Sequence, residues 1–162
     1  MNKLSVFLLA ALLLMLNGCG EKASDNENGM QPKTPKEEAV VTKLKKDAVA
    51  GNAEAQNNLG WIYFNGHGAT QDPQEGMKWF RMAAAQGNAQ AMLNLGGLYR
   101  NGQGVAQDYV RAQMWFGLAA AKGNIEAQQV NDMAVKHLTP AQLAEAKKMA
   151  LDCESSNYKN CG

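Results

Sequence analysis

An internal repeat of 36 residues constrains this chain more than any other feature of its sequence. Residues 51–86 align with residues 87–122 without a gap, and 18 of the 36 aligned pairs are identical. A third copy starts at Gly123 and fades beyond Gln128. A unit of this length cannot bury its hydrophobic face alone and does so by stacking on its neighbours. We therefore expect an array of similar units packed side by side.

Each unit has the pattern of two helices. In the first helix, apolar residues such as Ala55, Leu59 and Tyr63 recur at helical spacing on one face. Asp72 and Glu75 have the spacing of a capping box, which opens the second helix. No segment competes as a strand, so we expect an all-α fold with about seven helices. The expected ranges are 35–50, 53–65, 73–86, 89–101, 109–122, 125–136 and 139 (or 138) to about 152.

Glycines inside the first helices indicate close contact with a neighbour. Gly60 and Gly96 lie mid-helix, where glycine costs about 1 kcal/mol relative to alanine. We expect another helix to pass so close that no Cβ fits. The expected contact surfaces are the alanine runs 83–85 and 119–121, with Trp79 and Trp115 as large anchors.

The segments that flank the two repeats are expected to cap the array. The helix at 35–50 matches only the second half of a unit, so we interpret it as the N-terminal cap, opened by Thr34. Residues 123–162 are expected to form the C-terminal cap. The repeat domain is therefore expected to span residues 34–162.

The first 18 residues have the pattern of a secretory signal peptide. Lys3 gives a positive start, residues 4–16 are an apolar run too short to span a bilayer, and a small residue precedes Cys19. The sequence Leu-Asn-Gly-Cys resembles the bacterial lipobox, which implies cleavage before Cys19 and its acylation. The alternative is an ordinary signal peptide with a chance cysteine. Residues 19–33 are polar and are expected to form a flexible tether between lipid and domain.

These features predict a lipid-anchored protein of the bacterial cell envelope. Gly20, rather than aspartate, follows the cysteine, which resembles the outer-membrane sorting class and implies a position facing the periplasm. Removing Lys3 with the signal peptide takes 16 basic residues to 15, against 15 acidic residues. A net charge near zero gives no electrostatic case for binding nucleic acid or an anionic membrane face. The membrane contact that we expect is through the lipid anchor alone.

Two further cysteines, Cys153 and Cys161, are expected to form a disulfide. Export to an oxidising compartment favours a disulfide over a metal site for such a pair. The last helix is expected to end near Asp152, because the serines and asparagine after it favour a turn. The seven intervening residues are enough for the chain to fold back. The alternative is a free thiol pair used in redox chemistry, although the spacing is not C-x-x-C.

The repeated residues match a known pattern. A-x-x-x-L-G-x-x-Y-x-x-G-x-G-x-x-x-D, followed by W-F and A-A-A-x-G, occurs at residues 55–87 and again at 91–123. This pattern resembles the Sel1-like repeat, a relative of the tetratricopeptide repeat. The resemblance implies a right-handed α/α solenoid of helix-turn-helix repeats used for protein–protein contact, with the first helices lining its concave side. The third unit departs from the pattern, because Asn131 and Asp132 replace Leu-Gly, as suits an end cap.

The sequence contains no convincing catalytic or metal-binding pattern. His67 and His137 stand apart, and no His, Cys, Asp and Glu residues have ligand spacing, so we expect no metal and no cofactor. Ser156 and Lys159 satisfy S-x-x-K, and some Sel1-like proteins have been described as penicillin-binding. Of the companion elements, S-D-N occurs only at residues 24–26, in the expected tether, and K-T-G does not occur. We therefore expect a protein without enzymatic activity.

Candidate binding residues are those that differ between repeats, because buried positions of a solenoid recur while a binding surface is free to vary. One face of the first helices varies strongly: its middle position is Trp61 in the first copy and Gly97 in the second. An alternative for Trp61 and Phe64 is that they fill the joint with the N-terminal capping helix. The predicted partner contacts are Asn57, Trp61, Phe64, Leu93, Arg100 and Lys136.

These observations leave more than one function open. The first is a membrane-tethered periplasmic adaptor that binds an envelope protein or peptide in the concave groove. The second is a peptidoglycan-binding protein or an accessory of a cell-wall enzyme. A third is a structural domain that associates with itself.

Overall fold

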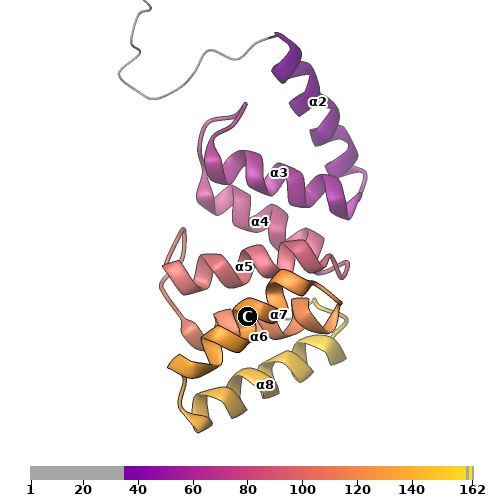
Figure 1. Ribbon diagram of the computed structural model, residues 1–162. Helices are drawn as coiled ribbons and strands as arrows, with labels where there is room; N and C mark the ends of the chain where they lie inside the picture. Colours follow the sequence, from indigo (N-terminus) through magenta and orange to yellow (C-terminus); the bar gives the residue numbers. More distant parts are fainter. Residues whose placement is uncertain (1–34, 160, 162) are drawn as a thin grey trace, which may run out of the picture. The chain divides into compact units, whose positions relative to one another are not determined.

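The computed structural model describes residues 35–159 and 161, which belong to one compact unit of residues 32–162. The predicted signal peptide, Cys19, the tether and Thr34 lie outside the described residues. The described part consists of seven α-helices and a 3₁₀ turn without a strand, which confirms the all-α prediction (Figure 1). The elements are α2 (Pro35–Val49), α3 (Ala53–Asn65), α4 (Pro73–Ala84), α5 (Ala89–Asn101), α6 (Tyr109–Ala121), α7 (Ile125–Ala134), η1 (Val135–His137) and α8 (Pro140–Ser155).

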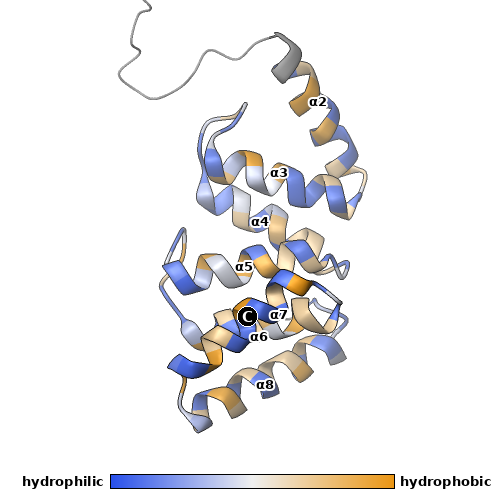
Figure 2. Ribbon diagram, in the orientation of Figure 1, coloured by the Kyte–Doolittle hydropathy of each residue, from blue (hydrophilic) through white to orange (hydrophobic). Residues whose placement is uncertain are grey.

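The helices form a solenoid of helix pairs, with α2 at the top of Figure 1 and α8 at the bottom. Within the repeats α3 packs on α4 and α5 packs on α6, and between them α4 packs on α5 and α6 on α7. At the two ends, α2 packs on α3 and α8 packs on α6, as expected for caps. Figure 2 shows hydrophobic and hydrophilic residues interspersed along each helix, which is typical of helices that bury one face. No helix in residues 35–159 has both the length and the hydrophobicity of a membrane span.

The repeat extends to the way in which the first helices begin. Asn52, Asn88 and Asn124 each precede a first helix, and each side-chain oxygen accepts a hydrogen bond from the amide three residues later, at 2.8, 2.9 and 2.8 Å. Asparagine is among the best N-cap residues, because its side chain satisfies an amide that has no partner within the helix. The third unit therefore keeps the helix start of the repeat although most of its other residues diverge.

The capping box predicted at Asp72 is only half formed. The Asp72 carboxylate accepts hydrogen bonds from the amides of Gln74 and Glu75 at 3.1 and 3.0 Å. The Asp72 amide, however, donates to the Tyr63 carbonyl at 2.7 Å and not to the Glu75 side chain. This bond ties the loop back to α3, so Glu75 is not needed as its acceptor. A complete capping box is present at Thr139, which starts α8.

The close approach predicted at the mid-helix glycines is confirmed, but the nearest atoms belong to neither the alanine runs nor the tryptophans that were expected. A Cβ on Gly60 would lie 2.7 Å from atoms of the Phe80 ring, and a Cβ on Gly96 would lie 2.5 Å from the Phe116 ring. The aromatic residue at each contact is thus the phenylalanine of the Trp-Phe pair. Trp79 instead packs against the small cluster that contains Leu59.

The prediction that the last helix ends near Asp152 is wrong, because α8 continues to Ser155. The Ser155 hydroxyl donates to the Asp152 carbonyl at 2.8 Å, so this serine satisfies a carbonyl of the last turn and does not end the helix. The chain turns at Asn157 and Tyr158, whose φ angles are 51° and 62°. The other boundary differences are smaller: α4 and α6 end one or two residues early, and α7 gives way to the 3₁₀ turn after residue 134.

Candidate functional site

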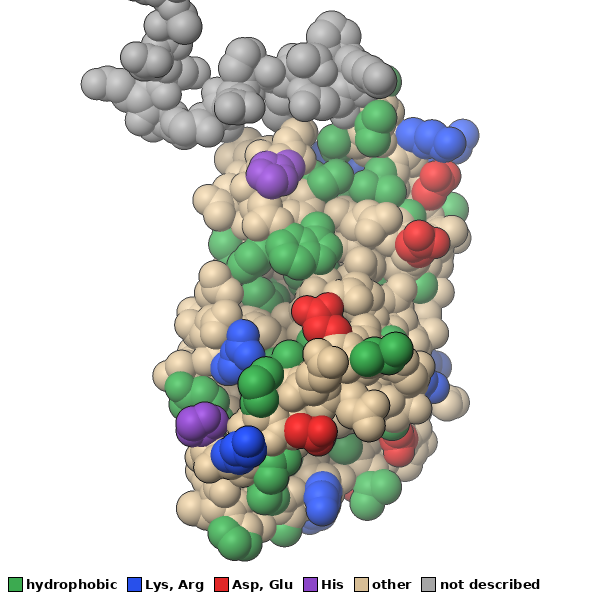
Figure 3. All heavy atoms as spheres, viewed as in Figure 1, with side chains coloured by type: hydrophobic (Ala, Val, Ile, Leu, Met, Phe, Trp, Pro, Cys, Tyr) green, Lys and Arg blue, Asp and Glu red, His purple; other side chains and the backbone are tan. Residues whose placement is uncertain are grey.

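A cavity of about 360 Å³ opens between α3, α5 and α7, and we call it the groove cavity. Its volume lies within the roughly 300–1,000 Å³ of typical ligand sites. Most of its lining comes from the first helices of the three units, which is the side that the Sel1-like resemblance implies for binding. On the face shown in Figure 3, hydrophobic side chains gather between α3 and α5. The aromatic lining residues are Trp61, Phe64, Phe80 and Phe116, and the polar ones are Gln90, Asn94, Arg100, Asn101, Gln103 and Glu126.

Four of the six predicted contacts meet in the groove cavity: Trp61, Phe64, Leu93 and Arg100. The Trp61 side chain is 43% exposed, although tryptophan is usually among the more buried residues. Its ring meets the Phe64 ring edge-on with centroids 5.9 Å apart, and the Phe80 ring edge-on at 6.3 Å. These contacts lie on α3 and α4. Trp61 therefore lies at the cavity wall, and the two rings that it meets, Phe64 and Phe80, do not belong to the capping helix α2.

Arg100 supplies the positive charge of the cavity. Its guanidinium carbon lies 5.8 Å from the centre of the Phe116 ring, within the range of a cation–π interaction. Its Nε donates to the Asn101 side-chain oxygen at 3.3 Å. Within the described part of the chain, no carboxylate forms an ion pair with Arg100. The guanidinium is exposed at the last turn of α5 and keeps donors that a bound molecule can use.

Asn57 and Lys136 do not line the groove cavity. Asn57 is only 6% exposed, and its side-chain oxygen accepts a hydrogen bond from Asn94 Nδ2 at 2.9 Å. This amide pair links the first helices of the two repeats, which explains why a polar residue is tolerated at a buried position. Lys136 lies in η1, because α7 ends at Ala134, and the helical spacing that placed Lys136 on the groove face does not continue there.

Polar residues that were not among the predicted contacts also line the cavity, among them Gln90, Asn94 and Glu126. Gln90 and Glu126 occupy equivalent places in the first turns of α5 and α7, and both line the cavity. The charge at this position differs between repeats, because Glu54 and Glu126 are acidic and Gln90 is neutral. The variation between repeats could therefore have identified both residues. Asn94 is identical to its counterpart Asn58, and a search for differences could not find it.

The S-x-x-K sequence does not form the arrangement that the motif needs. Ser156 and Lys159 follow the end of α8, and the two residues between them have left-handed backbone angles, so no helix places the lysine beside the serine. The Ser156 hydroxyl donates to the Cys153 carbonyl at 2.8 Å. His67 and His137 are exposed and far apart in sequence. Residues 35–159 and 161 contain no group of three His, Cys, Asp or Glu side chains that could hold a metal ion.

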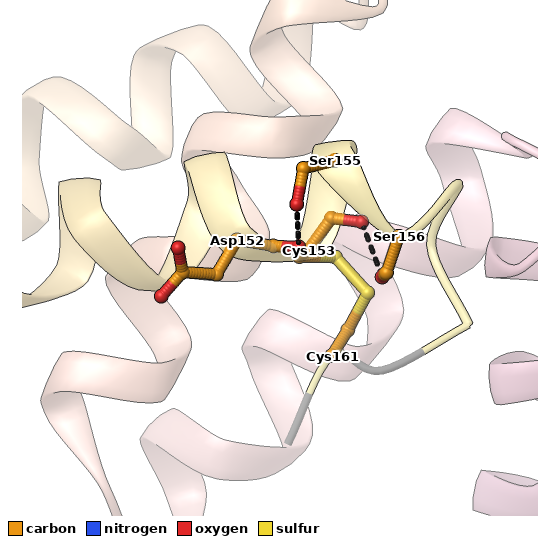
Figure 4. The surroundings of a disulfide bond; sticks show 5 residues. All are labelled: Asp152, Cys153, Ser155, Ser156 and Cys161. Atoms are coloured by element: carbon orange, nitrogen blue, oxygen red, sulfur yellow. Dashed lines mark hydrogen bonds between the residues drawn. A yellow bond between two sulfur atoms is a disulfide. The ribbon is translucent and has the colours of Figure 1, made fainter.

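The predicted cysteine pair is at disulfide distance. The Cα atoms of Cys153 and Cys161 lie 4.7 Å apart, and Figure 4 shows the bond between their sulfur atoms. The pair joins the last turn of α8 to the end of the chain, and both residues belong to the main hydrophobic core. The loop between them is also held by Tyr158, whose ring lies 4.8 Å from the Lys122 ammonium. This end of the array is therefore fastened to α6 as well as to α8.

Known proteins share both the repeat and the fold. The Sel1 repeat family matches residues 53–88 and 89–124. Among solved structures, a protective antigen of uropathogenic Escherichia coli strains with an SLR fold is 32% identical at a TM-score of 0.69, over 75% of this chain and 27% of the antigen. A Sel1 repeat protein from Oxalobacter formigenes is 36% identical at a TM-score of 0.58, over 60% of this chain and 40% of that protein. The chain thus corresponds to less than half the length of each. Among curated proteins, none matches.

The two matched segments coincide with the helix pairs α3–α4 and α5–α6, the same units that the internal repeat defines. The helical stacking and the glycine contacts at Gly60 and Gly96 follow from the residues that carry the match. The chain therefore contains two Sel1 repeats and shares the fold of solved Sel1-like repeat proteins.

Proposed function

We propose that this protein is a membrane-tethered periplasmic adaptor that holds an envelope protein, or a peptide segment of one, in the groove cavity between α3, α5 and α7. The Sel1 repeat is generally a protein-interaction scaffold and not an enzyme, which supports the class of activity. The tether and the location rest on the signal-like residues 1–18 and on Cys19.

The observation that carries the proposal is the combination of exposed Trp61 and exposed Arg100 on the walls of one cavity. Tryptophan and arginine dominate the energetics of protein interfaces, where truncating such an anchor typically costs about 2 kcal/mol or more. Neither residue is repeated in the equivalent position of the other unit. A purely structural role would favour the same residue at each junction, so their difference supports a role in recognition.

The test is affinity purification after crosslinking in intact cells, with the lipidated protein as bait. We expect a discrete partner that is crosslinked to the wild type and lost from the Arg100→Ala variant. The matched control is Lys78→Ala, which removes an exposed cation from α4, outside the groove cavity. A partner that is retained equally by both variants would contradict binding through the groove.

A peptidoglycan-binding function makes a different prediction. The purified protein would cosediment with isolated sacculi, and a groove-dependent ligand would be a glycan or its peptide. Cosedimentation that Arg100→Ala abolishes would replace the adaptor proposal with this second one.

A further inference from the structure

Gly97 leaves open space in the wall of the groove cavity. An ideal Cβ placed on Gly97 meets no atom within 4 Å, whereas a Cβ on the neighbouring Gly96 would lie 2.5 Å from the Phe116 ring. Glycine in the middle of a helix is less stable than alanine. Packing explains this loss at Gly96 but not at Gly97. A glycine that lowers helix stability without a packing reason indicates a functional position, so we infer that the open space above Gly97 is occupied by a bound molecule.

The first repeat shows what occupies the equivalent space. Gly97 corresponds to Trp61, which lies 36 residues earlier, and Phe116 corresponds to Phe80. The Trp61 ring meets the Phe80 ring edge-on, with centroids 6.3 Å apart and planes at 85°. Phe116 lies against Gly96 as Phe80 lies against Gly60, so the phenylalanine partner is in place in the second repeat. Gly97 and Phe116 both line the groove cavity, and the second repeat has no ring at the position that Trp61 occupies in the first.

The second neighbour of the Trp61 ring, Phe64, also has a counterpart in the second repeat that can bind an aromatic ring. In the first repeat Trp61 meets Phe64, at 5.9 Å between centroids. The counterpart of Phe64 is Arg100, whose guanidinium already lies 5.8 Å from the Phe116 ring. A guanidinium is planar and binds aromatic faces by stacking and by cation–π attraction. An aromatic group above Gly97 would therefore have Phe116 at its edge and Arg100 beside it.

We propose that the space over Gly97 is a pocket for one aromatic side chain of the bound partner, a tryptophan, tyrosine or phenylalanine. The partner supplies to the second repeat the ring that Trp61 supplies to the first. Arg100 then lies beside this ring and attracts it by stacking and cation–π interaction, and does not pair with an acidic residue of the partner. An acidic residue of the partner would also be repelled by Glu126, which lines the same cavity. This inference rests on the proposed function and specifies the chemistry of what the groove recognises.

The test uses a phage-displayed library of random dodecapeptides, selected on the full-length protein. We call a peptide a groove binder if it binds the wild type and does not bind the Arg100→Ala variant. We expect these peptides to share one aromatic residue, and replacement of that residue by alanine should weaken binding at least tenfold. Gly97→Trp places the missing ring in the chain itself and should weaken the same peptides at least tenfold. Lys78→Ala, on α4 and outside the groove cavity, is the control and should change binding less than threefold.

The outcomes separate this inference from the proposed function. Groove binders that share an acidic residue, or that Gly97→Trp leaves unaffected, would overturn the aromatic pocket but keep the groove as a binding site. The absence of any peptide that depends on Arg100 would overturn both. Gly97→Leu provides a second way of filling the space, so a folding defect in Gly97→Trp does not prevent the test. Far-ultraviolet circular dichroism and the melting temperature of each variant show whether it is folded.

Discussion

Replacing two adjacent glycines of α5 by alanine should change the stability of the protein in opposite directions. Gly96 and Gly97 lie in the same helix turn, so alanine brings both positions the same gain in helix propensity, about 0.5–1 kcal/mol. The new Cβ at Gly97 enters open space. The new Cβ at Gly96 would lie 2.5 Å from Cδ1 and Cε1 of Phe116, a ring that is 1% exposed and cannot swing away into solvent.

The magnitudes follow from these environments. Gly97→Ala should raise the free energy of unfolding by about 0.5–1 kcal/mol, because nothing opposes the gain in propensity. Overpacking a well-packed core costs about 1–3 kcal/mol, so Gly96→Ala should lower the free energy of unfolding by about 0–2.5 kcal/mol after that gain is subtracted. For a domain of this size, 1 kcal/mol corresponds to a shift of roughly 3–5 °C in the melting temperature.

The assay is urea unfolding of the wild type and both variants, followed by circular dichroism and tryptophan fluorescence. Coincident transitions and equal m values would establish that the variants differ in stability and not in cooperativity. A loss of stability in Gly97→Ala would refute the open space above residue 97. A stabilising effect of Gly96→Ala, equal to that of Gly97→Ala, would refute the contact between α5 and the Phe116 ring.

Three further predictions concern the C-terminal end, the second repeat and the N-terminus. Reduction of the Cys153–Cys161 disulfide should lower the free energy of unfolding by up to about 2.5 kcal/mol from the chain-entropy relation; equal melting curves with and without reductant, or alkylation of both cysteines in the non-reduced exported protein, would contradict the bond. Burial acts to raise the pKa of Asp108, but hydrogen bonds from the Arg111 amide and guanidinium outweigh it and hold that pKa below its ordinary value of 3.8. Because the folded-state pKa is the lower one, the carboxylate stabilises the fold above pH 3.8 and this contribution is lost as the pH falls through the folded-state pKa. Asp108→Asn should therefore lower the urea midpoint at neutral pH and make less difference at about pH 2, and an equal difference at both values would count against the assignment. Cys19→Ser should move the exported protein from the membrane to the soluble or uncleaved fraction, and a variant that stays with membranes after a high-salt wash would show that the anchor is not a lipid on Cys19.

The helices of the two repeats were predictable because their ends are marked by residues with a local physical effect. Gly66 and Gly102 follow α3 and α5 with φ angles of 76° and 67°, a conformation that favours glycine, and both helices end where the sequence predicts. The ends of α7 and α8 were less predictable, since the repeat has faded there. The serines after Asp152 were expected to form a turn, but their hydroxyls bond to carbonyls of the last helical turn.

The groove was predictable in part, from differences between repeats. That criterion located Trp61, Phe64, Leu93 and Arg100, which line the cavity. It included Asn57 because periodicity does not distinguish an exposed amide from a buried one that is paired across a repeat junction. The partner of Asn57 is Asn94, and only the folding of the two repeats brings these two side chains, 37 residues apart, together.

The groove is tested most directly by a photoreactive amino acid placed at single positions of the protein in living cells. Gln90 is exposed at the wall of the groove cavity, whereas Lys78 is exposed on α4 and does not line it. We expect an adduct of discrete mass from position 90, its loss when Arg100→Ala is added, and no such adduct from position 78. An adduct of equal yield from position 78, or an adduct from position 90 that persists in Arg100→Ala, would contradict the claim that this solenoid binds its partner through the groove.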